Sequence, residues 1–219
     1  MSLPFAVRDF MNVFKIYNQS IWPMQIVFYL LGFLILLFLK KEKNSSNKII
    51  MGILSFYWLW IGVFYHLTNF SDINKMAYAF GALFILEALI ILYAGLIKEY
   101  ISFNLNFDRY AIIGSIFIIY SMLIYPLIGY FLGHGYPFSP GFGVAPCPTA
   151  IFTFGVLLFA NKIRTKHLIW IPLIWSIIGT FAAVNLNIME DYGLFIAGIT
   201  GTLMFLSKYK IMKDEEFEK

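Results

Sequence analysis

Residues that commonly bind metal ions are few in this chain, and they lie near its polar connections. His66, His134 and Cys147, the single cysteine, carry imidazole nitrogens and a thiol. Zinc, copper and iron accept nitrogen, sulfur and oxygen ligands of this kind. Carboxylate oxygens would come from Asp72, Glu190 or Asp191. Because the spacing matches no compact metal motif, the alternatives are an organic-ligand site or hydrogen bonds that only join loops to helix ends.

An uncharged segment surrounds two of these residues. Residues 133–149 read Gly-His-Gly-Tyr-Pro-Phe-Ser-Pro-Gly-Phe-Gly-Val-Ala-Pro-Cys-Pro-Thr and include four of the eight prolines. Long connections without charge are uncommon unless they fold over something. Because Tyr136, Phe138 and Phe142 make this segment apolar, we expect it to form a lid in the mouth of a helical bundle. The alternative is a compact plug.

Glu87 lies in the middle of a long apolar stretch. An acid inside a membrane is costly, so a functional role is the default hypothesis. Glu87 would then couple proton movement or bind a cation; the alternative is a neutral side chain that bonds one neighbour. The candidate hydrogen-bond partners are Ser55, Tyr57, Tyr120, Ser121 and Thr180.

Composition places these residues in a membrane protein. The chain has 219 residues, of which 60% are apolar and 13% charged, against about a quarter charged in soluble domains. The net charge of +4 does not indicate nucleic-acid binding, because the basic residues lie in short loops between apolar stretches. A single cysteine excludes an intramolecular disulfide framework.

The apolar stretches predict an all-α, integral membrane bundle in the cell membrane. A bilayer-spanning helix needs about 20 apolar residues. Seven candidate spans cover about 21–39, 49–65, 77–97, 110–131, 145–161, 168–185 and 191–207. The domains are an amphipathic interfacial segment (1–20), the transmembrane domain (21–207) and a cytoplasmic tail (208–219). Since the fifth and seventh spans are short, six spans with a re-entrant piece are the alternative.

The N-terminal segment alternates apolar and polar residues at helical spacing. We expect a helix that lies in the membrane interface with its apolar side down, or a flap packed on the bundle. Its apolar side holds Val7, Phe10, Met11, Phe14 and Tyr17. Near the other end of the chain, Gly193, Ala197 and Gly201 form a small-residue stripe that permits close helix packing.

Basic residues predict the orientation. Lysine and arginine collect in cytoplasmic loops, and thirteen of the sixteen lie in alternate connections and the C-terminal tail. The other side has only Arg8, Lys15 and Lys75. This pattern predicts an external N-terminus and a cytoplasmic C-terminus.

With this topology, polar side chains from several connections lie at the outer end. We expect a site there in which His66, His134, Cys147 and Asp72 bind a metal. Ligand contacts would come from Asn74, Tyr136, Asp191 and, deeper, Glu87. The predicted function is binding or transport of a small solute or metal ion. A membrane-embedded metal enzyme and a structural or partner-binding protein are the alternatives.

The sequence lacks the residues that several familiar activities require. The seventh span has no lysine before Lys208, which excludes the Schiff base of retinal proteins. There is no serine elbow for Ser-His-Asp chemistry and no phosphate-binding glycine loop. A zinc amidase of the alkaline ceramidase type needs more histidines than the outer end has.

The chain resembles a prokaryotic family of small multi-pass membrane proteins, a domain of unknown function, over most of its length. The motifs that carry the resemblance are Ile21-Trp-Pro23, Trp58-Leu-Trp60, Tyr65-His66, Ile73-Asn74, Phe80-Gly-Ala-Leu-Phe84, Gly133-His-Gly-Tyr-Pro137, Pro146-Cys-Pro148 and Phe152-Thr-Phe-Gly155. The resemblance implies the multi-pass topology and leaves the activity open. It also implies that Glu87 often corresponds to a glutamine, which weighs against proton coupling.

Overall fold

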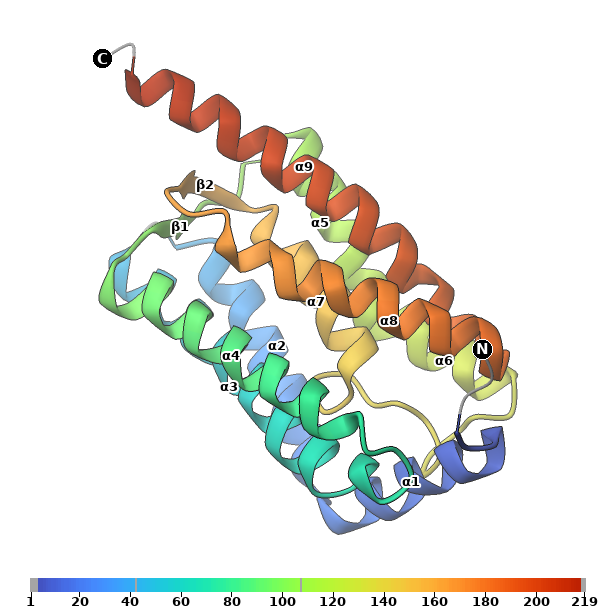
Figure 1. Ribbon diagram of the computed structural model, residues 1–219. Helices are drawn as coiled ribbons and strands as arrows, with labels where there is room; N and C mark the ends of the chain where they lie inside the picture. The colour runs from blue at the N-terminus through green and yellow to red at the C-terminus, as the bar shows by residue number, and fades with distance from the viewer. Residues whose placement is uncertain (1–3, 42, 107, 218–219) are drawn as a thin grey trace.

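A computed structural model describes residues 4–41, 43–106 and 108–217 as a helical bundle with one short strand pair (Figure 1). The all-helical prediction is therefore confirmed. The α-helices are α1 (Val7–Ser20), α2 (Met24–Leu39), α3 (Asn44–Trp60), α4 (Ala77–Leu92), α5 (Arg109–Ile119), α6 (Tyr125–Phe131), α7 (Pro146–Leu157), α8 (Trp170–Leu186) and α9 (Tyr192–Phe217). Short π- or 3₁₀-helical turns are η1 (Ile61–Leu67), η2 (Phe70–Asp72), η3 (Tyr93–Ile97), η4 (Tyr120–Ile124), η5 (His167–Ile169) and η6 (Met189–Asp191).

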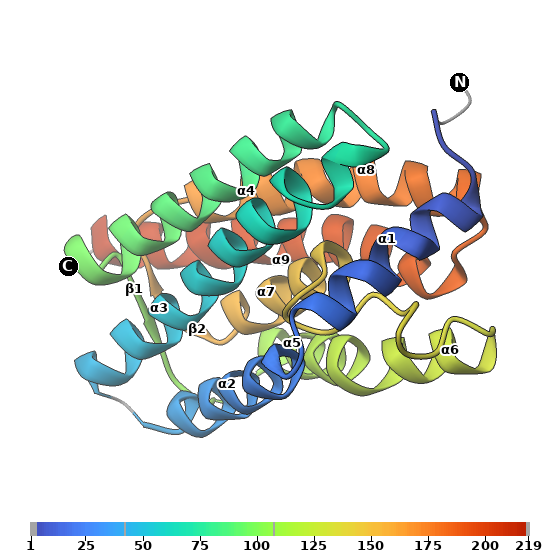
Figure 2. The ribbon, with the colours of Figure 1, turned by 90° about the horizontal axis from the view of Figure 1, so that it is seen from below.

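Several of these helices join into segments long and apolar enough to cross a membrane. Among the described residues there are five: Asn44–Asp72, Ala77–Ile97, Arg109–Phe131, His167–Leu186 and Met189–Glu215. Helices α1 and α2, both labelled in Figure 2, make a sixth only if they count as one span. They are bent by 84°. Large apolar side chains also remain exposed along α2, α4, α5, α8 and α9. These features indicate a membrane protein.

The predicted number of seven spans is not confirmed. The fifth predicted span corresponds to α7, which has 12 residues. At about 1.5 Å per residue it is far shorter than the hydrocarbon core of a bilayer. Helix α7 ends at Leu157, and the chain then continues into strand β2 (Ala160–Ile163). This strand pairs antiparallel with β1 (Ile101–Phe103). The seventh span is longer than predicted, because α9 continues through the predicted tail to Phe217.

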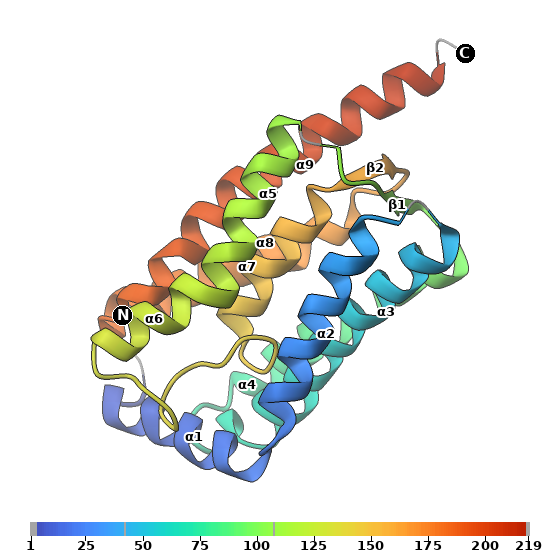
Figure 3. The same cartoon turned by 180° about the vertical axis from the view of Figure 1, so that it is seen from behind.

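Helix α7 is the centre of the bundle. It packs against α3, α5, α8 and α9, and Figure 3 shows it enclosed between α2 and α5. All of its side chains except that of Cys147 are buried. The small-residue stripe of α9 packs closely as predicted, since a Cβ on Gly201 would lie 2.8 Å from the ring of Phe154. This short helix of 12 residues thus forms the core.

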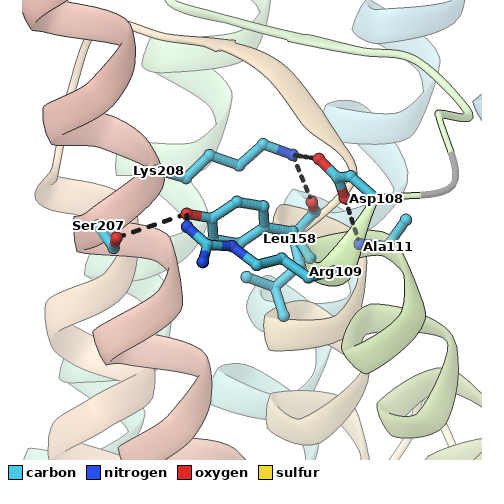
Figure 4. Close-up of polar contacts among 7 residues, drawn as sticks. Asp108, Arg109, Ala111, Leu158, Ser207 and Lys208 are labelled. Carbon is cyan, nitrogen blue, oxygen red and sulfur yellow. Dashed lines mark hydrogen bonds and ion pairs between the residues drawn. The ribbon is translucent and has the colours of Figure 1, made fainter.

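The C-terminal end of α7 is held by a lysine from α9. Lys208 Nζ donates to the carbonyl oxygen of Leu158 at 2.9 Å and lies 3.4 Å from a carboxylate oxygen of Asp108 (Figure 4). The same ammonium group lies 4.9 Å from the ring centroid of Tyr110. Asp108 also caps α5 by accepting from the Ala111 amide. Figure 4 shows that this contact joins α5, α7 and α9.

The two ends of the bundle differ. Helix α1, η2, the connection between α6 and α7, and η6 gather at one end, and β1, β2 and the C-terminus lie at the other (Figures 1 and 3). The segments predicted to share the outer side therefore do share one end. Their placement relative to a membrane remains a prediction.

We predict that Lys208→Met destabilises the bundle by about 1–3 kcal/mol, because a buried carbonyl of α7 loses its charged donor. Thermal unfolding in detergent measures the change. Lys210→Met, an exposed lysine on the same helix, is the matched control. Equal melting temperatures for the two variants would contradict the role of Lys208.

Candidate functional site

A cavity of about 430 Å³ lies between α1 and the end of the bundle. Phe10 and Phe14 of α1 line it on one side, and Trp175 and Gly179 of α8 on the other. Further lining residues include Phe5, Tyr65, Phe70, Asn74, Phe80, Pro146, Cys147, Ile178, Leu186 and Asp191. We call it the α1 cavity. Its volume lies within the range of small-molecule sites, and its walls are mostly apolar, with many aromatic rings.

Helix α1 covers this cavity because its apolar side faces the bundle. Phe10, Met11, Phe14 and Tyr17 are buried, and Phe10 and Phe14 pack against Phe70 and Tyr65. The helix therefore packs on the bundle, as the flap hypothesis expects, and its position in a membrane interface stays a prediction. The helix was predicted correctly, but Val7 lies exposed rather than on its buried side.

The connection between α6 and α7 packs under α1, as the lid hypothesis expected. Asn18 Nδ2 donates to the carbonyl oxygens of Pro137 and Ser139 at 2.7 and 2.8 Å. Phe142 is buried against Tyr57 and Phe152. Only the second half of the segment is in the core, since Tyr136 is 59% exposed.

The polar end of the α1 cavity is formed by Cys147 and Asp191. Asp191 Oδ1 accepts a hydrogen bond from the Tyr125 hydroxyl at 2.5 Å. The Cys147 thiol also lies within hydrogen-bonding range of the Asp191 carboxyl group. Cys147 opens α7 from the Pro-Cys-Pro motif, so its backbone is restricted by the two proline rings. One carboxyl group and one thiol therefore face an otherwise apolar space.

Trp175 adds a donor at this end. Its Nε1 atom is buried and makes no hydrogen bond of normal geometry within the described part of the chain. A Cβ on Gly179 would lie 3.5 Å from both Trp175 Nε1 and Cys147 Sγ. The same Cβ would lie only 2.7 Å from Leu194 Cδ2, so the glycine lets α8 pack closely against α9 beside the donor and the thiol.

A second polar layer lies behind Asp191. Glu190 is fully buried, and its Oε1 atom lies 2.8 Å from His134 Nδ1. The Tyr120 hydroxyl donates to the backbone carbonyl of Glu190 at 2.7 Å. Two adjacent acids thus contact different partners: Asp191 faces the cavity, and Glu190 is held by His134.

The π-helical turn η4 directs two tyrosines toward these acids. In a regular α-helix, residues five positions apart differ in direction by about 140°. The wider turn at Tyr120–Ile124 lets Tyr120 and Tyr125 both contact η6. It directly precedes Pro126, which has no amide hydrogen to donate. Sequence reasoning missed Tyr125 as a site residue because helical periodicity does not predict this turn.

His66 is near the cavity but behind its wall. The rings of Phe84 and Trp175 lie 4.7 and 5.1 Å from its ring. Both ring nitrogens are buried without a hydrogen-bond partner among the described residues. His66 was predicted as a metal ligand, and it instead packs in an aromatic cluster.

The other predicted contacts are divided. Asn74 lines the α1 cavity, where its side-chain oxygen accepts from the Met76 amide. Asp72 lines a separate small pocket against α1, and Tyr136 contacts Trp22 instead. Across the described residues, no three His, Cys, Asp or Glu side chains come together as a metal-ligand set. The arrangement pairs Cys147 with Asp191 and His134 with Glu190, so a metal centre at this end has no geometric support.

Glu87 is fully buried in α4, away from the residues that line the α1 cavity. Neither carboxyl oxygen has a hydrogen-bond partner among the described residues. The predicted partners all donate elsewhere: Ser55 to Ala88, Tyr57 to Phe28, Tyr120 to Glu190, Ser121 to Ile118 and Thr180 to Ser176. The expected bond to a neighbour is therefore not present, because each hydroxyl satisfies a backbone carbonyl.

We predict that Glu87→Leu raises the free energy of unfolding by about 1–3 kcal/mol, because a buried polar group without a partner is removed. Thermal unfolding in detergent measures it. Glu99→Gln is the contrasting variant, since the Glu99 carboxylate is exposed and accepts from Lys48 at 2.7 Å, which holds its pKa below the ordinary value. That variant should lower the melting temperature slightly. A lower melting temperature for Glu87→Leu would mean that the carboxyl group has a bound partner.

Comparison with known proteins places the chain in a family without assigning an activity. No curated protein and no solved structure shows significant similarity to it. A family of unknown function, DUF6064, matches residues 7–216, which is nearly the whole chain. The resemblance to an uncharacterised family is thereby confirmed, and the chain belongs to DUF6064.

Proposed function

We propose that the protein binds a small, largely apolar molecule in the α1 cavity, through a hydroxyl or similar group that both donates and accepts hydrogen bonds. The observation that carries this proposal is the pairing of an unsatisfied donor with an acceptor. Trp175 Nε1 is buried and makes no hydrogen bond of normal geometry among the described residues, although it lies close to the Cys147 thiol, and the Asp191 carboxyl group lines the same cavity. A buried donor without a partner costs about 1–3 kcal/mol, so a ligand that accepts from it gains affinity.

The walls define the rest of the ligand. Phe10, Phe14, Tyr65, Phe80 and Trp175 line the cavity with aromatic rings. Burial of apolar surface contributes about 25 cal/mol per Å², so the rings favour a hydrocarbon or ring system. A hydrophilic solute would have to leave its hydration shell without replacement, which makes it a poor occupant.

Binding is better supported than the alternatives from the sequence. A purely structural role does not require a cavity of about 430 Å³ beside a carboxyl group. A metal-dependent enzyme needs a ligand set, and the described residues form none. Transport needs a polar path from this end past Glu87, and neither oxygen of the Glu87 carboxyl group has a hydrogen-bond partner among the described residues.

The proposed site lies at the end of the bundle predicted to face out of the cell. In this orientation the N-terminus is outside, the C-terminus is cytoplasmic, and α1 separates the cavity from the external side. An apolar ligand in the cell membrane would then enter from the outer half of the bilayer.

Farnesol and farnesyl methyl ether are matched probes, because only the alcohol donates a hydrogen bond. We predict that wild-type protein in detergent binds farnesol more tightly than the ether. Trp175→Phe should weaken farnesol binding about fivefold through the loss of one hydrogen bond, with the melting temperature unchanged or raised. Trp22→Phe, at a tryptophan that is 59% exposed and outside the cavity lining, is the control and should bind as the wild type does.

Two further variants test the space inside the cavity and its polar end separately. Ala182→Leu enlarges a partly buried side chain in the cavity lining and should weaken binding of both probes. Asp191→Asn should remove the preference for the alcohol and leave the ether bound as before. If Ala182→Leu remains folded and binds farnesol as tightly as the wild type, the α1 cavity is not the site.

A further inference from the structure

A second hollow lies at the opposite end of the bundle from the α1 cavity. It has a volume of about 450 Å³ and runs between the C-terminal part of α4 and the start of α8. Its apolar lining includes Leu89, Ile90, Ala94 and Ile171. Ala94 and Ile171 are buried and form part of its base. We call it the lateral groove.

The lateral groove is bordered by surface that faces hydrocarbon in a membrane. Leu89, Tyr93 and Trp170 line it and are also exposed, and Ile97 next to it is 65% exposed. Leu89 and Tyr93 belong to the span Ala77–Ile97, and Trp170 to the span His167–Leu186. An apolar groove between two candidate spans is open to acyl chains, so its occupant comes from the bilayer.

One end of the lateral groove is polar and positively charged. Thr165 and His167 line it, and Lys166 lies between them in the sequence and is exposed. On the other side, Lys98 Nζ lies 5.8 Å from the ring centroid of Tyr93. The aromatic rings of Tyr93, Tyr100 and Trp170 line the same end, as is usual where a membrane protein meets the headgroup layer.

The carboxylate of Glu99 does not cancel the positive charge of Lys98 and Lys166. Glu99 follows Lys98 in the chain, and its carboxylate is bound by Lys48 Nζ at 2.7 Å and by Asn44 Nδ2 at 3.0 Å. The two lysines that flank the groove therefore act on an occupant with little compensation from Glu99. Each lysine near a membrane surface attracts anionic lipid by about 1 kcal/mol.

We infer that the lateral groove binds one anionic phospholipid, with an acyl chain along Leu89, Ala94 and Ile171 and the phosphate between Lys98 and Lys166. The apolar lining of the groove leads to a positively charged end. This combination matches an amphiphile with a negative headgroup. The inference is independent of the α1 cavity, since the two hollows share no lining residue.

Native mass spectrometry of the full chain in detergent tests it, with dioleoyl phosphatidylglycerol and dioleoyl phosphatidylcholine as the probes. We expect one phosphatidylglycerol molecule to be retained in preference to phosphatidylcholine. Lys98→Gln with Lys166→Gln should reduce this preference about thirtyfold, from two lost attractions. Lys40→Gln with Lys41→Gln neutralises the same charge at the same end, outside the groove lining, and should leave the preference unchanged.

A groove-filling variant provides the second arm. Leu89→Trp introduces a large ring at an exposed position that lines the groove, and it should reduce retention of both lipids while the melting temperature is preserved. Equal retention of the two lipids by the wild type would overturn the inference. So would equal losses in the two lysine pairs, or full displacement of the lipid by glycerol 3-phosphate, which has a phosphate and no acyl chain.

Discussion

The structure depends on satisfying the two ends of α7, a short helix in the centre of an apolar bundle. Inside a membrane, backbone groups must find partners within the protein because no water reaches them. At the first end, the connection from α6 packs under α1, and the Tyr17 hydroxyl donates to the carbonyl of Val144 at 2.9 Å. At the last end, Lys208 donates to the carbonyl of Leu158. A helix of 12 residues can therefore lie between longer ones without crossing the bilayer.

The same constraint accounts for the candidate site. Because α7 starts well inside the bundle, Cys147 lies below the end of the surrounding helices, and space remains above it. Helix α1 covers that space with Phe10 and Phe14, while η6 brings Asp191 to its side. The α1 cavity thus lies between the start of α7, helix α1 and η6. Its polarity is confined to one end, where Tyr125 holds Asp191.

His66 and Glu87 are among the buried side chains without hydrogen-bond partners in the described structure, and they differ in their surroundings. His66 lies against Trp175, which lines the α1 cavity. Glu87 lies on α4, outside the lining of both the α1 cavity and the lateral groove. An unpaired polar group in the interior lowers stability. Both His66 and Glu87 therefore lower the stability of the fold, but of these two only His66 lies beside a residue that lines the α1 cavity. This contrast supports a role near the ligand for His66 more than for Glu87.

Composition and periodicity alone determined the helical class, the apolar membrane character and the amphipathic N-terminal helix, because these depend on local patterns. Alternation of basic connections also predicted which segments share an end, and they do lie together. The tertiary structure decided that α7 is enclosed by α3, α5, α8 and α9, since which helices pack around a segment is not a local property. It also brought Cys147 to Asp191 and His134 to Glu190 instead of gathering a metal-ligand set, because side chains more than 40 residues apart meet only through packing. The π-helical turn before Pro126 shifts Tyr125 out of the regular helical phase.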